Sequence, residues 1–186
     1  MRAKLGLVWV LLFVVATPGP APAATPPASM SVVDFFHLLC DAKKLHLETP
    51  DRASLLSKKN GAVVDVPNGY LRTHGDGAQP TYTLALFRRP DQSPVVAVVD
   101  DGADPFFEDL TIFTLDDQGR PVDITKKAWP LKLPKDGVEG PITRYYLPRY
   151  GRTITVVVQP ADLSPSFAHR ASVAWVKDRF IVEPEE

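Results

Sequence analysis

The chain has 186 residues, of which 45% are hydrophobic and 23% charged, and its formal net charge is −1 at pH 7. These values are typical of a globular protein that buries a core of its own, and they exclude a wholly disordered chain. A charge so close to zero provides neither the basic stripe that binds nucleic acid nor the polybasic patch that binds a membrane surface. We therefore expect neither partner.

Residues 1–23 have the three parts of a cleavable signal peptide. A positively charged start is followed by an apolar run over residues 5–16, and Ala21-Pro22-Ala23 has the small-residue pattern that signal peptidase cleaves. The run is shorter than the roughly 20 residues of a membrane-spanning helix. We expect cleavage between Ala23 and Ala24, a mature protein that is secreted or periplasmic, and no membrane contact after cleavage.

The rest of the chain divides into a linker and one domain. Residues 24–30 are rich in Pro and Ala, which predicts a disordered stretch. Periodic apolar patterns begin at Ser31, so we predict a single domain over residues 31–186. Cys40 is the only cysteine, which excludes an internal disulfide. We expect it to act as a small hydrophobic residue on the buried face of a helix.

Two helices are predicted at the start of this domain. Ser31 and Asp34 fit a capping box, and apolar residues then recur at helical spacing to about Lys44. Thr49-Pro50-Asp51 has the residue types that begin a second helix, and the run that ends at Gly61 has those that stop one.

From residue 62 onward the apolar pattern changes to a period of two, which predicts strands joined in hairpins. We place the centre of the fold at residues 81–101, where the run Val95–Val99 is apolar on both faces and is therefore predicted to be a central strand. In the last hairpin a two-residue turn at Lys177-Asp178 would place Trp175 opposite Phe180 and Val173 opposite Val182. The other predicted strands cover 62–66, 70–72, 110–115, 121–124, 142–147 and 152–159, with an irregular connection over 129–140.

These elements predict an α+β fold, in which two N-terminal helices pack on a curved antiparallel sheet built of hairpins, as in cystatin-like or NTF2-like folds. The alternative is a β-sandwich or a partial barrel with N-terminal helices. A pattern found in secreted bacterial domains of no known function resembles less than half of this chain: Thr49–Arg52 with Leu55 and Leu56, then Asp65, the stretch Asn68–Leu71 and the strand Tyr82–Phe87. That resemblance implies no activity.

An acidic loop follows the central hairpin. Its carboxylates suit Ca²⁺, although their spacing is not that of an EF-hand, and the simpler interpretation is a solvated loop between two strands. The candidate ligands are Asp100, Asp101, Asp104, Glu108 and Asp109.

The four histidines are scattered and have no zinc-binding spacing on a helix. A catalytic pair made of His74 or His169 with a carboxylate would need residues from distant segments. No phosphate loop, dinucleotide fingerprint or nucleophile elbow is present. We therefore expect no cofactor, and we assign no catalytic or metal-binding residue.

Aromatic and basic side chains surround one hairpin tip, with Tyr146, Arg149 and Tyr150 as the binding candidates beside Tyr145 and Arg152. Such a group can bind a carbohydrate or an acidic peptide, or it can serve only strand packing and a soluble turn.

Three functions remain open. The first is a non-enzymatic domain that binds a protein or a small ligand. The second is a small hydrolase that uses a His–carboxylate pair, and the third is an extracytoplasmic module stabilised by Ca²⁺.

Overall fold

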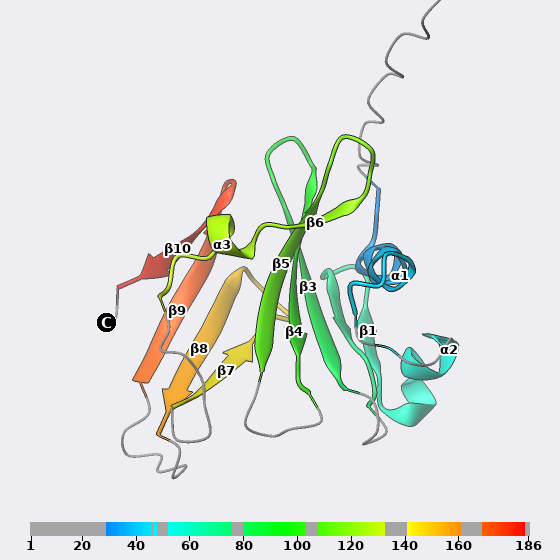
Figure 1. Ribbon diagram of the computed structural model, residues 1–186, viewed down its shortest axis with the longest axis horizontal. Coiled ribbons are helices and arrows are strands. Elements are labelled where there is room, and N and C mark those ends of the chain that lie inside the picture. Colours follow the sequence, from blue (N-terminus) through cyan, green and yellow to red (C-terminus); the bar gives the residue numbers. More distant parts are fainter. Residues whose placement is uncertain are drawn as a thin grey trace, which may run out of the picture.

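The computed structural model describes residues 29–45, 47, 52–75, 80–102, 108–132, 141–160 and 169–184 (Figure 1). Within these ranges the chain forms two antiparallel sheets and few helices, so the predicted α+β class rich in antiparallel hairpins is confirmed. The predicted signal peptide, the linker up to residue 28 and the predicted start of the second helix lie outside the described residues.

The elements follow one another as hairpins. The helices are α1 (Val32–Asp41), α2 (Arg52–Leu55) and α3 (Thr125–Ala128), with a 3-10 turn, η1 (Lys58–Asn60). The larger sheet has the order β1 (Val63–Asp65), β2 (Tyr70–Arg72), β3 (Tyr82–Arg88), β4 (Pro94–Asp100), β5 (Asp109–Leu115) and β6 (Pro121–Asp123). The smaller sheet has the order β10 (Arg179–Glu183), β9 (His169–Val176), β8 (Thr153–Gln159) and β7 (Ile142–Tyr146). No described helix is long and apolar enough to cross a membrane.

The helix α1 begins at the predicted capping box. Ser31 Oγ accepts a hydrogen bond from Asp34 N at 3.2 Å, and the Asp34 carboxylate accepts one from Ser31 N at 2.8 Å. The helix ends at Asp41, three residues before the predicted end. Lys43 takes the left-handed conformation there, with φ 52°, and Lys44 N donates to Leu39 O at 2.9 Å. This is a Schellman ending formed without glycine, and the sequence therefore did not signal it.

The second predicted helix is short in the described residues. After the single turn of α2, Ser57 is extended, η1 follows, and Gly61 stops the run with φ 95°. The stop at Gly61 is as predicted. Only α1 is a helix of several turns, so the described residues do not show the two N-terminal helices that were predicted.

The strand β4 is the centre of the fold, as predicted. Six of its seven residues are buried, and alternate residues belong to two different apolar clusters. Val96 and Val98 face the buried residues of α1, whereas Val95, Ala97 and Val99 face the smaller sheet. Figure 1 shows α1 and the smaller sheet on opposite sides of the larger one.

The two sheets pack face to face through the second cluster, and no closed barrel forms. Phe87 of β3 contacts the rings of Trp175 and Phe180, with centroids 5.7 and 5.2 Å away. Trp175 Nε1 also donates to Arg88 O at 3.0 Å, which satisfies the indole where it enters the core. The arrangement is thus closer to the sandwich alternative than to a single curved sheet.

The final hairpin has the predicted register. Trp175 lies opposite Phe180, and Val173 lies opposite Val182. Lys177 takes φ 60°, the conformation that a tight two-residue hairpin turn requires. Val182 lies on the same face as Phe180 but is exposed, because β10 is the outer strand of its sheet.

The helix α3 was not predicted. Asp123 Oδ1 accepts hydrogen bonds from Thr125 N at 2.8 Å and from Thr125 Oγ1 at 2.6 Å, which organises the start of the helix. Thr125 Oγ1 in turn accepts a hydrogen bond from Ile112 N at 2.8 Å. Residues 129–132, the described part of the predicted irregular connection, contain neither helix nor strand.

We predict that Gly69→Ala destabilises the domain by about 2–3 kcal/mol, more than the change in backbone conformation alone would cost. Gly69 has φ 66°, and an added Cβ would lie 3.0 Å from Leu86 O and 3.1 Å from Leu86 Cβ. Gly119→Ala is the matched control, since its φ of 73° is similar but nothing lies within 4 Å, and it should cost about 1 kcal/mol. Urea unfolding of both variants measures the difference, and equal losses would contradict the prediction.

Candidate functional site

The smaller sheet does not cover the whole inner face of the larger one. β7 is the outer strand of the four-stranded sheet, and a cleft of about 220 Å³ lies between it and strands β2–β4. The residues that line this cleft are Tyr70, Arg72, Thr83, Val99, Asp101, Glu108, Tyr145, Tyr146 and Leu147. It brings together residues from both predicted clusters, the acidic loop and the aromatic hairpin.

The register explains why polar side chains occur here. Tyr70 lies opposite Ala85, and Arg72 lies opposite Thr83, so Tyr70 and Arg72 share the face that packs on the smaller sheet. Ala85 is buried there by the second sheet, whereas β2 lies beyond the reach of that sheet and carries residues that tolerate water. The alternation of β2 fixes which residues line the cleft.

Glu108 joins the two sides of the cleft. Its Oε1 accepts a hydrogen bond from Arg144 Nη1 at 2.8 Å, and its Oε2 accepts one from Tyr145 N at 2.8 Å. The side chains of Glu108 and Arg144 are 12% and 21% exposed, so the ion pair is largely shielded from water. Asp101 Oδ1 lies 4.0 Å from the same Arg144 Nη1. The charges of Glu108 and Arg144 are therefore balanced within the protein.

A second ion pair lies next to the cleft. Arg149 Nε donates to Asp65 Oδ2 at 2.8 Å, and this hydrogen bond holds the pKa of Asp65 below its usual value. The guanidinium carbon of Arg149 lies 5.3 Å from the centre of the Tyr150 ring, within cation–π range. Asp65 lies opposite Tyr70 in the sheet, and burial raises the pKa of Tyr70.

Two tyrosines present their rings to water beside these ion pairs. Tyr146 is 59% exposed and Tyr150 is 68% exposed, the highest values among the exposed large hydrophobic side chains of the described residues. An exposed aromatic side chain beside a polar cleft can contact the flat face of a ligand while its hydroxyl stays wet. The geometry supports binding of a ligand that lies partly outside the cleft.

The acidic loop does not act as one cluster. Asp100 is the last residue of β4 and lies opposite Asp109, while Asp101 and Glu108 line the cleft. Asp104 lies outside the described residues. Over the ranges that the structure describes, no three His, Cys, Asp or Glu side chains are close enough to hold a metal ion.

The two candidate histidines, His74 and His169, are not part of the cleft. The main-chain N–H of His74 donates a hydrogen bond to Leu55 O at 3.1 Å, and the imidazole ring of His74 lies beside Gly61. His169 begins β9 opposite Val158. Neither residue lines the cleft. Asp76, the nearest candidate partner of His74 in the sequence, lies outside the described residues.

Cys40 lies on α1 as predicted, but it is half-buried and packs at the edge of the first cluster. Burial raises the pKa of its thiol, which makes it less reactive than a free cysteine. This agrees with the structural role expected from the sequence.

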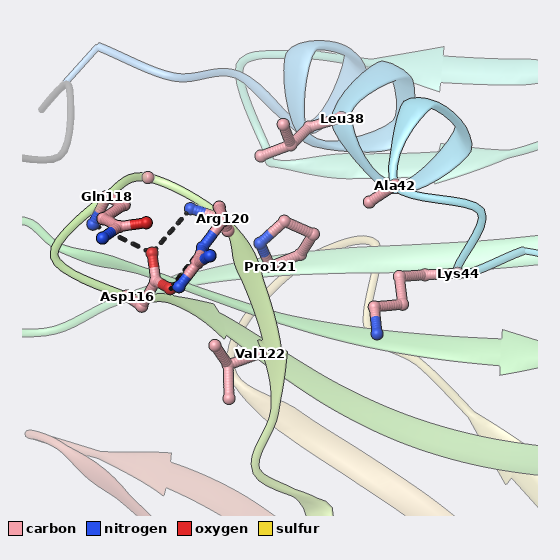
Figure 2. A pocket seen from close by; sticks show the side chains of 9 residues that line it. Leu38, Ala42, Lys44, Asp116, Gln118, Arg120, Pro121 and Val122 are labelled. Carbon is pink, nitrogen blue, oxygen red and sulfur yellow. Dashed lines mark hydrogen bonds and ion pairs between the residues drawn. The ribbon is translucent and has the colours of Figure 1, made fainter.

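A larger groove of about 670 Å³ separates α1 from the turn between β5 and β6 (Figure 2). Leu38 and Ala42 project from α1 toward Pro121, which gives the groove an apolar floor. At the rim Arg120 Nε donates to Asp116 Oδ2 at 2.8 Å, so these two charges satisfy one another. Lys44 and Gln118 also line the groove, but most of its surface is apolar, whereas the cleft beside β7 presents more polar surface to a ligand and is the better candidate.

Sequence reasoning missed Tyr70, Arg72, Asp65 and Arg144. Each lies on a strand whose alternating side-chain directions follow from the sequence. The part of the sheet face that stays uncovered, however, depends on how the two sheets overlap. The local pattern carries no signal of that overlap.

No family model matches the chain, and no curated protein matches it. A solved structure of a domain of an uncharacterized protein from Porphyromonas gingivalis W83 is similar, with 14% identity and a TM-score of 0.45. The similarity covers 62% of this chain and 71% of that one.

We predict that Glu108→Gln destabilises the domain by about 1–2 kcal/mol, because the partly buried Arg144 loses its charged partner while the side-chain shape is kept. Asp117→Asn is the control, since it removes a carboxylate from an exposed turn and should change stability by less than about 0.5 kcal/mol. Chemical denaturation at pH 7 measures both changes. An effect of Glu108→Gln no larger than that of the control would contradict the role assigned to the ion pair.

The Asp65–Arg149 pair predicts a pH dependence. The pKa of Asp65 is lowered by folding, so the carboxylate stabilises the fold at pH values above its ordinary value of 3.8. That contribution is lost as the pH falls through the lowered pKa. Asp65→Asn should therefore reduce the melting temperature near neutral pH, and this reduction should become smaller as the pH falls below 3.8. A difference between the two proteins that stays constant from neutral to acid pH would disprove the linkage.

Proposed function

We propose that the protein is an exported, non-enzymatic binding domain, and that the cleft beside β7 holds part of a neutral polar ligand such as a saccharide chain. The observation that carries the proposal is the combination of internally balanced charges with exposed aromatic rings. Glu108 balances Arg144, and Asp65 balances Arg149, while Tyr146 and Tyr150 remain open to solvent.

The charge balance favours a neutral ligand. An anionic ligand would have to compete with Glu108 and Asp65 for Arg144 and Arg149, and each displaced carboxylate would lose short, charge-assisted hydrogen bonds. Arg72 also lines the cleft, but the carboxylates of Asp101 and Glu108 line it too and oppose a negatively charged ligand there. A ligand rich in hydroxyl groups can instead contact groups at the edge of these pairs, such as Asp101 and Arg72, without breaking them. The electrostatics thus favour a carbohydrate over the acidic peptide that the sequence left open.

The volume of the cleft favours a ligand that extends beyond it. About 220 Å³ is less than the volume of most pockets that enclose a small molecule. A chain of several sugar rings could place one ring in the cleft and lay others on Tyr146 and Tyr150, where an aromatic face offers apolar contact. The sequence predicts that the protein is exported, and an exported protein can encounter such saccharide chains.

Binding is better supported than hydrolysis. Among the residues that the structure describes, the lining contains no His, Ser or Cys, and the carboxylate of Glu108 is engaged by Arg144 and Tyr145. Asp101 is the other carboxylate of this lining, whereas glycoside hydrolysis uses a pair of carboxyl groups, one of which must be free to donate a proton to the substrate. We further propose that both N-terminal helices cover the outer face of the larger sheet and leave its inner face for the ligand.

The test is binding of the mature protein to a panel of neutral oligosaccharides, measured by calorimetry and on a glycan array. Replacing both Tyr146 and Tyr150 by Ala should weaken binding at least tenfold, because each ring supplies contact area and little else holds an exposed sugar. Val122→Ala is the control, since Val122 is exposed but lies in the groove beside α1.

Two outcomes would contradict the proposal. One is binding of acidic peptides, but of no neutral saccharide, through the same tyrosines. The other is saccharide binding that the tyrosine changes leave unaltered, which would place the site elsewhere.

A further inference from the structure

The strand β10 is an outer strand with apolar side chains exposed on both faces. Ile181 is 37% exposed on one face and Val182 is 45% exposed on the other. β10 pairs with β9 on one side, and no described strand pairs with its other side. Figure 1 shows β10 at the outer margin of the molecule, away from the larger sheet. Such an edge is a template for pairing with another strand.

The main-chain groups that face outward can be identified from the register. Trp175 N donates to Arg152 O at 2.8 Å, so the main chain of Trp175 points toward β8 and away from β10. In an antiparallel ladder, directly opposite residues alternate between pairs that exchange hydrogen bonds and pairs that exchange none. Phe180 lies opposite Trp175, and Val182 lies opposite Val173. The N–H and C=O groups of Phe180 and Val182 therefore point to the open edge.

We propose that the open edge of β10 pairs with β10 of a second copy of this chain, antiparallel and centred on Ile181. In that register Phe180 lies opposite Val182 of the second copy, and each donates its outward N–H to the outward C=O of the other. The two smaller sheets then continue as one sheet across the twofold axis. This interface is isologous, because each strand presents the same groups to the other.

The side chains of β10 complement themselves in the same register. Arg179 lies opposite Glu183 of the second copy, and Glu183 lies opposite Arg179 of the second copy, so opposite charges meet at both ends. Ile181 lies between them on the same face and meets its own counterpart. Val182 covers the edge of Phe180 of the second copy on the other face. Arg179 and Glu183 form no ion pair with other side chains across the described ranges.

These features favour a second copy over a different protein. A foreign strand could use the main-chain groups, but the order Arg-Phe-Ile-Val-Glu is complementary in charge to its own reverse, and any other partner would have to match that order independently. The contact is small, so we expect a weak dimer in exchange with the monomer.

The experiment is sedimentation equilibrium of the mature protein from about 10 µM to about 1 mM. Wild type should show a monomer–dimer equilibrium. Arg179→Glu and Glu183→Arg each place like charges opposite one another at both ends, and each should weaken the dimer about tenfold or more. Arg170→Glu makes the same charge change on β9, away from the open edge, and should leave the dimer unchanged.

A mixture of the two weakened variants gives the sharpest result. Arg179→Glu carries Glu at both ends of the strand, and Glu183→Arg carries Arg at both, so a heterodimer restores an attractive pair at each end. The mixture and the double variant R179E/E183R should both regain wild-type association.

Several results would overturn the proposal. The first is a wild-type protein that stays monomeric to about 1 mM. The second is that the single variants dimerise as well as wild type. The third is a mixture of the two variants that fails to associate although both keep the wild-type melting temperature. A dimer that persists in Val182→Pro, which lacks the outward N–H but keeps the pairing with β9, would likewise exclude this edge.

Discussion

The fold depends on the burial of both faces of β4. Its valines and alanine alternate between a cluster under α1 and a cluster under the smaller sheet, so one strand supplies both hydrophobic cores. Neither cover can be lost without exposing an apolar face of the same strand. This requirement fixes a three-layer arrangement, in which the helix, the larger sheet and the smaller sheet stack in that order.

The cleft is a consequence of unequal layers. Six strands lie on one side of the sandwich and four on the other, so part of the inner face of the larger sheet extends beyond β7. The sequence places Tyr70 and Arg72 at that overhang, and Glu108 ties the margin of the smaller sheet to it. The candidate site therefore rests on rigid strands, with its exposed tyrosines on or next to β7.

Local rules were enough for most elements, and long-range contacts were needed for the rest. The capping box at Ser31, the central position of Val95–Val99 and the register of the last hairpin follow from neighbours in the sequence, and all are confirmed. The non-glycine helix ending at Lys43 and the short helix α3 carried only weak local signals. The sequence identified the acidic loop and the aromatic hairpin as separate candidate sites. Their meeting at one cleft depends on how the two sheets overlap, and the apolar periodicity of the sequence does not indicate that overlap.

The order of the strands has a consequence for how the domain folds. Every strand pair in both sheets joins elements that are consecutive in the chain, so each ladder closes only a short loop and costs little chain entropy. The distant contacts are concentrated where the sheets meet, above all at Trp175, which reaches Arg88 across 87 positions of sequence. Each meander can form early on its own, and the docking of one on the other is then the slow, cooperative step that creates the core between the two sheets.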